Sequence, residues 1–282
     1  MSDQILQQIA NIANFTANRA EQTLQLDLAR FWADEIARPR NAHPKRLLRY
    51  GFKVFSQSDE DGIIQEIFNR IGTTNRTFIE FGVETGIECN TVKLLLEGWR
   101  GLWLEGLATN VANIRTNFSS FVDAGRLQTV EAFITAENID ALFVQGGLTG
   151  EIDLLSIDMD RNDYWVWKAI EVVKPRVVAI EYNATLRPPL SLVVPYDARA
   201  IWNQTNYFGA SLEALTRLGR EKGYRLVGCN FAGSNAFFVR NDATGDHFFD
   251  PATSEELYEP PRYFYASVRA GHPPQPGPYV TV

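Results

Sequence analysis

Between residues 51 and 240, short apolar runs alternate with longer amphipathic segments, and this alternation constrains the fold more than any other feature. The apolar runs predict seven strands, at 77–81, 101–105, 127–132, 152–158, 177–182, 225–229 and 236–240. Helical periodicity falls between them, at 62–71, 90–97, 110–121, 162–173 and 210–222. Alternation at this spacing predicts right-handed crossovers and a doubly wound, mainly parallel α/β sheet.

The final two strands are expected to be connected differently from the others. Only a few residues, Gly233 among them, separate 225–229 from 236–240, which is too short for a helical crossover. These two strands are therefore expected to pair as an antiparallel hairpin at one edge of the sheet.

The segments on either side of the sheet region differ from it in composition. Residues 1–50 contain no glycine, and Ile5, Ile9 and Ile12 form one apolar stripe, which predicts an N-terminal helical extension. Residues 241–282 hold seven of the thirteen prolines and are expected to be mostly irregular. Because the apolar stripe has to be buried, we expect it to cover the active site or to form a homodimer contact. The expected parts are 1–50, 51–240 and 241–282.

Charge and composition exclude several classes of function. Acidic side chains (34) exceed basic ones (27), giving a net charge of −7, and no basic block offers a groove for nucleic acid. The longest apolar runs, such as 177–180, are far shorter than the ~20 residues that span a bilayer, so no membrane partner is expected. The N-terminus lacks a signal-peptide pattern, and two cysteines, Cys89 and Cys229, are too few for a disulfide framework. A cytoplasmic location is therefore expected.

The segment 78–86, Phe-Ile-Glu-Phe-Gly-Val-Glu-Thr-Gly, runs from a predicted strand through a glycine-containing turn towards a helix. Gly82 and Gly86 would let the backbone approach a ligand closely, and a helix N-terminus offers free N–H groups. The third glycine of the dinucleotide fingerprint is missing. Glu80 would also repel a pyrophosphate and attract a cationic ligand. An ordinary strand-to-helix turn is the alternative interpretation.

Glu105 ends the next predicted strand, Gly-Leu-Trp-Leu-Glu. A carboxylate at this position of a doubly wound sheet can accept hydrogen bonds from both hydroxyls of a ribose. The alternative is a solvated acid in a loop.

These residues together resemble the class I S-adenosylmethionine (SAM)-dependent methyltransferases. The resemblance lies in Glu-x-Gly-x-x-x-Gly at 80–86, an acid after the second strand and Ile157-Asp158 after the fourth. More narrowly, Ser-Gln-Ser-Asp-Glu-Asp at 56–61 resembles a stretch of FkbM-type methyltransferases, although their Asp-x-Glu-Gly after the fourth strand is Asp-Met-Asp-Arg here. The resemblance covers about 51–240 and implies a Rossmann-like methyltransferase fold with SAM as cofactor. It implies cofactor contacts at Gln57, Glu80, Gly82, Thr85, Gly86, Glu105 and Asp158.

Oxygen-bearing side chains follow the fourth and fifth predicted strands. Asp158 and Asp160 end one strand, and Glu181 and Asn183 end its neighbour, so the four are expected to converge at one edge of the sheet. Hard cations such as Mg²⁺ prefer these ligands. The arrangement is similar to that of catechol-type O-methyltransferases, which hold Mg²⁺ after the same strands, although their Asp-Asn pair is adjacent. Contacts to SAM, substrate hydroxyls or backbone amides without a metal are the alternative.

The general base and the substrate contacts are less clearly marked. None of the three histidines lies in a strand-end motif, so Asp158 or Asp160, or a metal that acidifies the substrate hydroxyl, is favoured, with His247 as the alternative base. A long insertion follows the fifth strand and suits a substrate-binding lid; a packed surface loop is equally compatible. The substrate contacts expected from it are Arg187, Tyr196, Asp197 and Tyr207.

The sequence thus predicts a SAM-dependent methyltransferase. As the FkbM resemblance implies, the acceptor is expected to be a hydroxyl of a sugar or other small natural-product-like molecule, with Mg²⁺ as a candidate second cofactor. Three alternatives remain: N-methylation of a small amine, a nucleotide-binding oxidoreductase, and a catalytically silent binding module of the same fold. The incomplete glycine fingerprint opposes the oxidoreductase, and the intact strand-end acids oppose the silent module.

Overall fold

The computed structural model describes residues 3–266 and 271–282, in two compact units, Met1–Pro44 and Lys45–Val282. In the first unit, helix α1 (Asp3–Ile36) is followed by a 3₁₀ turn, η1 (Pro39–Asn41). The predicted N-terminal helix is therefore confirmed. It ends just before Arg38, where the following proline disfavours a helical backbone. Among the described residues no helix is long and apolar enough to cross a membrane.

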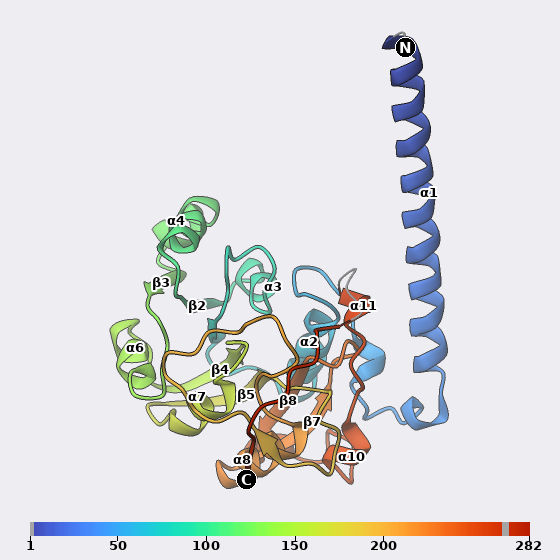
Figure 1. The fold of residues 1–282 in the computed structure, drawn as a ribbon. Coiled ribbons are helices and arrows are strands. Elements are labelled where there is room, and N and C mark those ends of the chain that lie inside the picture. Colours follow the sequence, from blue (N-terminus) through green and yellow to red (C-terminus); the bar gives the residue numbers. More distant parts are fainter. Residues whose placement is uncertain (1–2, 267–270) are drawn as a thin grey trace. The chain divides into compact units, whose positions relative to one another are not determined.

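The second unit is built on a seven-stranded sheet (Figure 1). Five strands run parallel, and the last two form an antiparallel hairpin, with β8 between β5 and β7. This confirms the predicted fold class. In spatial order the strands are β3 (Leu127–Glu131), β2 (Arg100–Glu105), β1 (Thr77–Phe81), β4 (Gly150–Ile157), β5 (Val173–Glu181), β8 (Asn235–Arg240) and β7 (Tyr224–Cys229).

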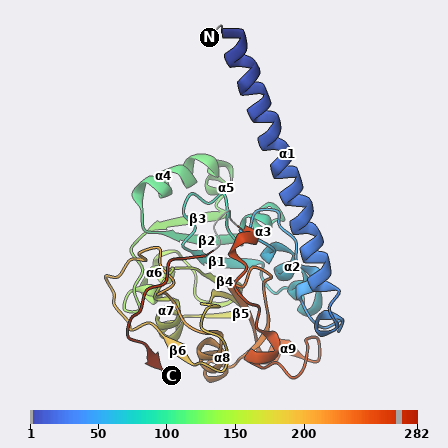
Figure 2. The same cartoon turned by 45° about the vertical axis from the view of Figure 1, so that its right-hand side comes forward.

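Helices cover both faces of this sheet, as a doubly wound fold requires (Figure 2). One face packs against α6 (Ile139–Gln145), α7 (Asp163–Ala169) and α8 (Leu212–Glu221). The other packs against η2 and the first helices of the unit: η2 (Leu48–Tyr50), α2 (Glu60–Ile71), α3 (Val92–Leu96), α4 (Ala108–Asn117) and α5 (Ser119–Asp123). Side chains alternate between the two cores along each strand: Ile79 and Phe81 enter one, Phe78 the other.

Several predicted boundaries were wrong. The helix expected at 162–173 stops at Ala169, and β5 already begins at Val173. The helix expected at 110–121 is two helices, α4 and α5, and the short α6 was missed altogether.

The C-terminal part contains more regular structure than its prolines indicate. Three short helices are present, α9 (Asn241–Thr244), α10 (Ser254–Leu257) and α11 (Tyr263–Ala266). The final strand β9 (Val280–Thr281) pairs antiparallel with β6 (Leu192–Val193), which belongs to the insertion after β5. The tail also bonds to that insertion where Asn206 N–H donates to the carbonyl of Pro273 (3.0 Å). The last residues therefore hold the insertion in place through backbone hydrogen bonds.

Candidate functional site

The parallel strands change direction of winding between β1 and β4, and ligands in open α/β sheets bind beyond the carboxyl ends of the strands at such a point. Gly82 lies there with φ +79°, and a Cβ on it would come within 1.7 Å of the carbonyl oxygen of Asp158. Gly86 (φ +77°) lies against the ring of Trp103 in the same way, at 2.7 Å. Only glycine lets the turn after β1 lie directly on the loop after β4.

Glu80 stabilises the segment after this turn through hydrogen bonds. Its carboxylate accepts hydrogen bonds from the backbone N–H groups of Asn90 (2.8 Å) and Thr91 (3.0 Å), and from the hydroxyls of Thr91 (2.5 Å) and Ser156 (3.0 Å). Burial raises the pKa of Glu80 despite these donors. The side chain anchors the start of α3, so any effect on a ligand acts through the turn.

Glu105 connects the loops that follow β1 and β2. One carboxylate oxygen accepts from Glu84 N–H (2.9 Å), and the other from Leu107 N–H (2.9 Å) and the Asn110 amide (3.2 Å). Glu84 itself has φ +48°. This backbone conformation is strained for a residue that has a side chain, and such strained residues occur at functional sites more often than elsewhere. Glu105 therefore fixes a strained turn at the sheet edge.

A pocket of about 450 Å³ opens beside this turn. It is lined by Lys53, Val54, Phe55, Val83, Glu84, Thr85, Ile87 and Glu88. Of the sequence-predicted cofactor contacts, Thr85 lies in the wall, and Gln57 is next to it, where its carbonyl accepts from the Lys53 ammonium (3.0 Å). The sequence did not single out the other lining residues as contacts.

Asp61 shapes the wall formed by Lys53, Val54 and Phe55. A single carboxylate oxygen accepts from the N–H groups of Val54 (2.7 Å), Phe55 (2.7 Å) and Ser56 (2.8 Å), and from the Ser56 hydroxyl (3.0 Å). This concave backbone arrangement around an anion is a nest. The acidic stretch at 56–61 is thus buried and structural, and it presents the residues before it to the pocket.

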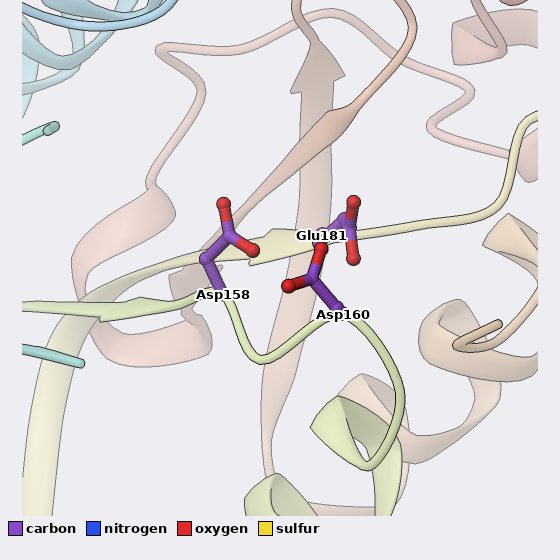
Figure 3. A group of neighbouring side chains, drawn as sticks. All are labelled: Asp158, Asp160 and Glu181. Atoms are coloured by element: carbon purple, nitrogen blue, oxygen red, sulfur yellow. The ribbon is translucent and has the colours of Figure 1, made fainter. Parts of the chain in front are cut away.

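Three carboxylates gather where β4 and β5 end (Figure 3). Asp158, Asp160 and Glu181 each offer an oxygen within 4.8 Å of the others. Within residues 3–266 and 271–282, no hydrogen bond or ion pair reaches these three carboxylates, and Oε2 of Glu181 is fully buried without a partner. Asp160 is turned into the group by a backbone with φ +62°. Three of the four predicted metal ligands are therefore brought together.

Crowding and burial favour the protonated forms of these acids. Burial, followed by Asp160 and Asp163, raises the pKa of Asp158 well above its usual range, and burial with Asp158 does the same for the pKa of Glu181. The pKa of Asp160 is raised to about 6 by burial and by Glu84, although the residue opens to solvent. Burial raises the pKa of Asp163 to about 7, even though Met159 N–H donates to it (2.8 Å). A cation would relieve this repulsion.

Asn183 and His247 are corrections to the predicted site. The Asn183 amide donates to the carbonyls of Asn206 (2.9 Å) and Phe208 (3.0 Å), and its oxygen accepts from Thr185, so it is occupied in ordering the insertion. His247 follows β8, which runs antiparallel and ends beside the start of β5. It therefore lies at the opposite edge of the sheet, where its carbonyl accepts from Arg70 (3.0 Å). The sequence could not reveal this, because it left the direction of the chain after β8 open.

The four predicted substrate contacts lie on the insertion, but most are tied to protein groups. The Tyr196 hydroxyl donates to Glu137 (2.6 Å), and the Tyr207 hydroxyl donates to the carbonyl of Pro278 (2.5 Å). Tyr207 is also buried. Asp197 and Arg187 are exposed, and the Asp197 carboxylate accepts from the N–H of Arg199 (3.0 Å). The structure therefore leaves Asp197 and Arg187 as the accessible members of the set.

The insertion and the C-terminal part form an aromatic group that the sequence did not indicate. His272 packs edge-on against Trp202 (4.8 Å between ring centroids) and Phe208 (5.9 Å), and lies 5.2 Å from the Tyr263 ring. Burial raises the pKa of Tyr263, and the charge of Glu181 raises it further. The insertion and the C-terminal part thus form one aromatic group, whose Tyr263 is under the influence of the Glu181 charge.

No family model matches the chain, and no curated protein sequence matches it. Among solved structures, the N-terminal domain of EvdMO1 with SAH bound is similar at 16% identity over 73% of this chain and 94% of that chain, with a TM-score of 0.42. An O-methyltransferase from Bacillus cereus in complex with SAH is 14% identical over 76% and 87%, at 0.41. The glycopeptide N-methyltransferase MtfA with sinefungin is 14% identical over 63% and 85%, at 0.40. The last two of these proteins are named as methyltransferases; at these identities the likeness concerns the fold alone.

Proposed function

We propose that the chain is a SAM-dependent methyltransferase that methylates a hydroxyl of a small molecule. The observation that carries this proposal is the pocket beside the glycine-containing turn after β1, at the switch point of the sheet. SAM carries a positive sulfonium, which carboxylates attract. Glu105, at the tip of β2, would accept the ribose hydroxyls.

In methyl transfer the main task of the protein is to position the acceptor oxygen and the methyl group. The acceptor oxygen forms a bond to the methyl carbon as the carbon–sulfur bond breaks, and the hydroxyl proton passes to a carboxylate. Asp160 suits the role of acceptor of this proton, because its pKa of about 6 leaves it ionised at neutral pH and basic enough to take a proton. One oxygen of Asp160 lies within 4.8 Å of oxygens of Asp158 and Glu181. The backbone carbonyl of Asp158 in turn lies directly against Gly82, in the turn after β1.

The three carboxylates also fit a divalent cation such as Mg²⁺. The buried, unpartnered oxygen of Glu181 supports this assignment, as does the lack of an ion pair to the three carboxylates within the described residues. Asp158, Asp160 and Glu181 would be the ligands, and Asn183 is occupied elsewhere. When bound, the cation would lower the pKa of the acceptor hydroxyl. The residues themselves would orient the acceptor towards the cofactor pocket.

A sugar is the acceptor class that we propose first. Aromatic rings beside carboxylates can hold a hydroxyl-rich ring, whose C–H face packs on the rings while its hydroxyls donate to the acids. Trp202, His272 and Tyr263 form such a group of rings, and the charge of Glu181 acts on Tyr263.

The activity is tested by incubating the protein with methyl-labelled SAM and a panel of monosaccharides and nucleotide sugars, and measuring both S-adenosylhomocysteine and labelled product. We expect turnover with at least one sugar, and loss of turnover with retained SAM affinity in Asp160→Asn. Methylation of amines alone would replace the hydroxyl proposal by the N-methyltransferase alternative. Bound SAM without turnover on either class would favour a silent binding module.

A further inference from the structure

We infer that Lys53 binds the α-carboxylate in the amino-acid tail of SAM, and that Glu88 is the partner which Lys53 gives up when the ligand enters. This inference rests on the proposed function and assigns one end of the ligand to one end of the pocket. Among the described residues that line the pocket, Lys53 is the only basic one, beside two glutamates, Glu84 and Glu88. A zwitterionic tail requires this combination of one cation and a carboxylate.

The contact between Lys53 and Glu88 is suited to exchange. The ammonium lies 2.7 Å from Oε1 of Glu88, but the two side chains are 47% and 55% exposed. Exposed ion pairs of this kind stabilise a protein only weakly, so a ligand carboxylate held against the pocket wall can displace Glu88. Two donors of the ammonium are occupied among the described residues, by Glu88 and by the carbonyl of Gln57.

The backbone that follows Lys53 is fixed, although its side chain is half exposed. The next three N–H groups, of Val54, Phe55 and Ser56, all donate to the buried carboxylate of Asp61, within 2.8 Å. Only the side chain therefore has to reorder on binding, which keeps the entropic cost of the new contact small.

Glu84 supplies the other half of the tail site. Its backbone N–H is held by Glu105, the proposed ribose-binding residue, and its φ of +48° turns the exposed side chain along the pocket wall. The tail ammonium would pair with Glu84, while Lys53 takes the carboxylate. Glu105 thus connects the proposed ribose site with the proposed tail site, because it accepts the hydrogen bond from the N–H of Glu84.

The test compares two probes on four proteins by titration calorimetry. S-adenosylhomocysteine carries the amino-acid tail, and 5′-methylthioadenosine lacks it. The proteins are the wild type, Lys53→Gln, Glu88→Gln, and the control Lys45→Gln, which removes another lysine that forms an ion pair, to Asp246 (3.5 Å), and does not line the pocket. Thermal melts check that each variant is folded.

We expect Lys53→Gln to weaken S-adenosylhomocysteine about tenfold or more and to leave methylthioadenosine unchanged, because only the former loses a charge-assisted contact. Glu88→Gln should keep or tighten the binding of S-adenosylhomocysteine, and Lys45→Gln should change neither probe. Equal losses for both probes in Lys53→Gln, no loss, or a matching loss in Glu88→Gln would overturn the inference while leaving the proposed function standing. A wild type that binds neither probe would overturn both.

Discussion

Buried acids in this chain serve two different purposes. Asp153 is saturated with donors: it accepts from the N–H groups of Thr74, Asn75 and Arg76, and pairs with Arg176 at 2.9 Å. Both oxygens of Glu80 are bonded in the same manner, and Asp61 holds its loop through one oxygen, Oδ2. The group at the ends of β4 and β5 is the opposite case, with no donor within the described residues. Asp158 and Glu181 are half-buried and Asp160 is exposed, and carboxylates crowded in this way without a partner repel one another, so the group points to a ligand.

Glu105 tests the cofactor site at the level of one side chain. Glu105→Ala removes the acceptor of the ribose hydroxyls and the support of the Glu84 turn, and the loss of charge-assisted hydrogen bonds of ~1.5–3 kcal/mol should weaken SAM about ten- to a hundredfold. Calorimetry measures the affinity. Glu131→Ala is the matched control, because Glu131 is the exposed partner of Glu105 in the strand register. Unchanged affinity in Glu105→Ala, with the fold intact, would refute the assignment.

The metal assignment is tested at the triad. Excess chelator should abolish methyl transfer and Mg²⁺ should restore it, because the cation would balance the three crowded carboxylates. Glu181→Gln should weaken Mg²⁺, measured by calorimetry, without unfolding the domain. Asp123→Asn, on α5, serves as the control. Full activity in excess chelator would refute the metal and leave the proton with Asp160 alone.

Asp59 makes the stability of the fold depend on pH. Burial and the charge of Glu60 raise its pKa from 3.8 to about 7, although Phe231 N–H donates to it (2.9 Å). Below pH 3.8 the carboxyl is protonated in the folded and the unfolded chain, so its stability contribution is fully present. It is lost as the pH rises through about 7, at up to ~1.4 kcal/mol per pH unit.

Asp59→Asn should remove this dependence. Denaturant unfolding at pH 5 and pH 8 should show a smaller fall in the free energy of unfolding for the variant than for the wild type. An equal fall in the two proteins would show that Asp59 carries no such penalty.

At the level of elements, the sequence predicted the sheet well because buried parallel strands are continuous apolar runs, as in Val177–Ile180 of β5. Short helices such as α6 were missed, because seven residues give too little periodicity. The strand-end acids were found from topology alone, since parallel strands place their carboxyl ends together. Lys53 and His272 were missed because their positions depend on a nest around Asp61 and on packing of the C-terminal part.

The N-terminal helix α1 belongs to a separate compact unit, and we expect its apolar stripe at Ile5, Ile9 and Ile12 to form a homodimer contact. A chain that starts at Lys45 should keep a cooperative thermal transition, because the second unit has its own core. Light scattering should give a dimer for the full chain and a monomer for the truncated one. A monomeric full chain that loses activity on truncation would favour an active-site cover, and unchanged mass and activity would show that α1 is dispensable.

For the whole molecule, everything that we assign to catalysis lies on one edge of the sheet. The pocket, the glycine turn and the three carboxylates lie at the carboxyl ends of β1, β4 and β5. The opposite edge carries His247 and the end of α2, which the proposed reaction does not use. The insertion after β5 and the tail that holds it contribute the aromatic group.

The central claim, that this edge binds SAM, is tested most directly by calorimetric titration of the wild-type protein with S-adenosylhomocysteine. The site predicts binding of one ligand per chain with a dissociation constant in the micromolar range, about −8 kcal/mol. NAD should give no heat, because the glycine fingerprint for its pyrophosphate is missing. Absence of binding at millimolar S-adenosylhomocysteine, or preferential binding of NAD, would contradict the account.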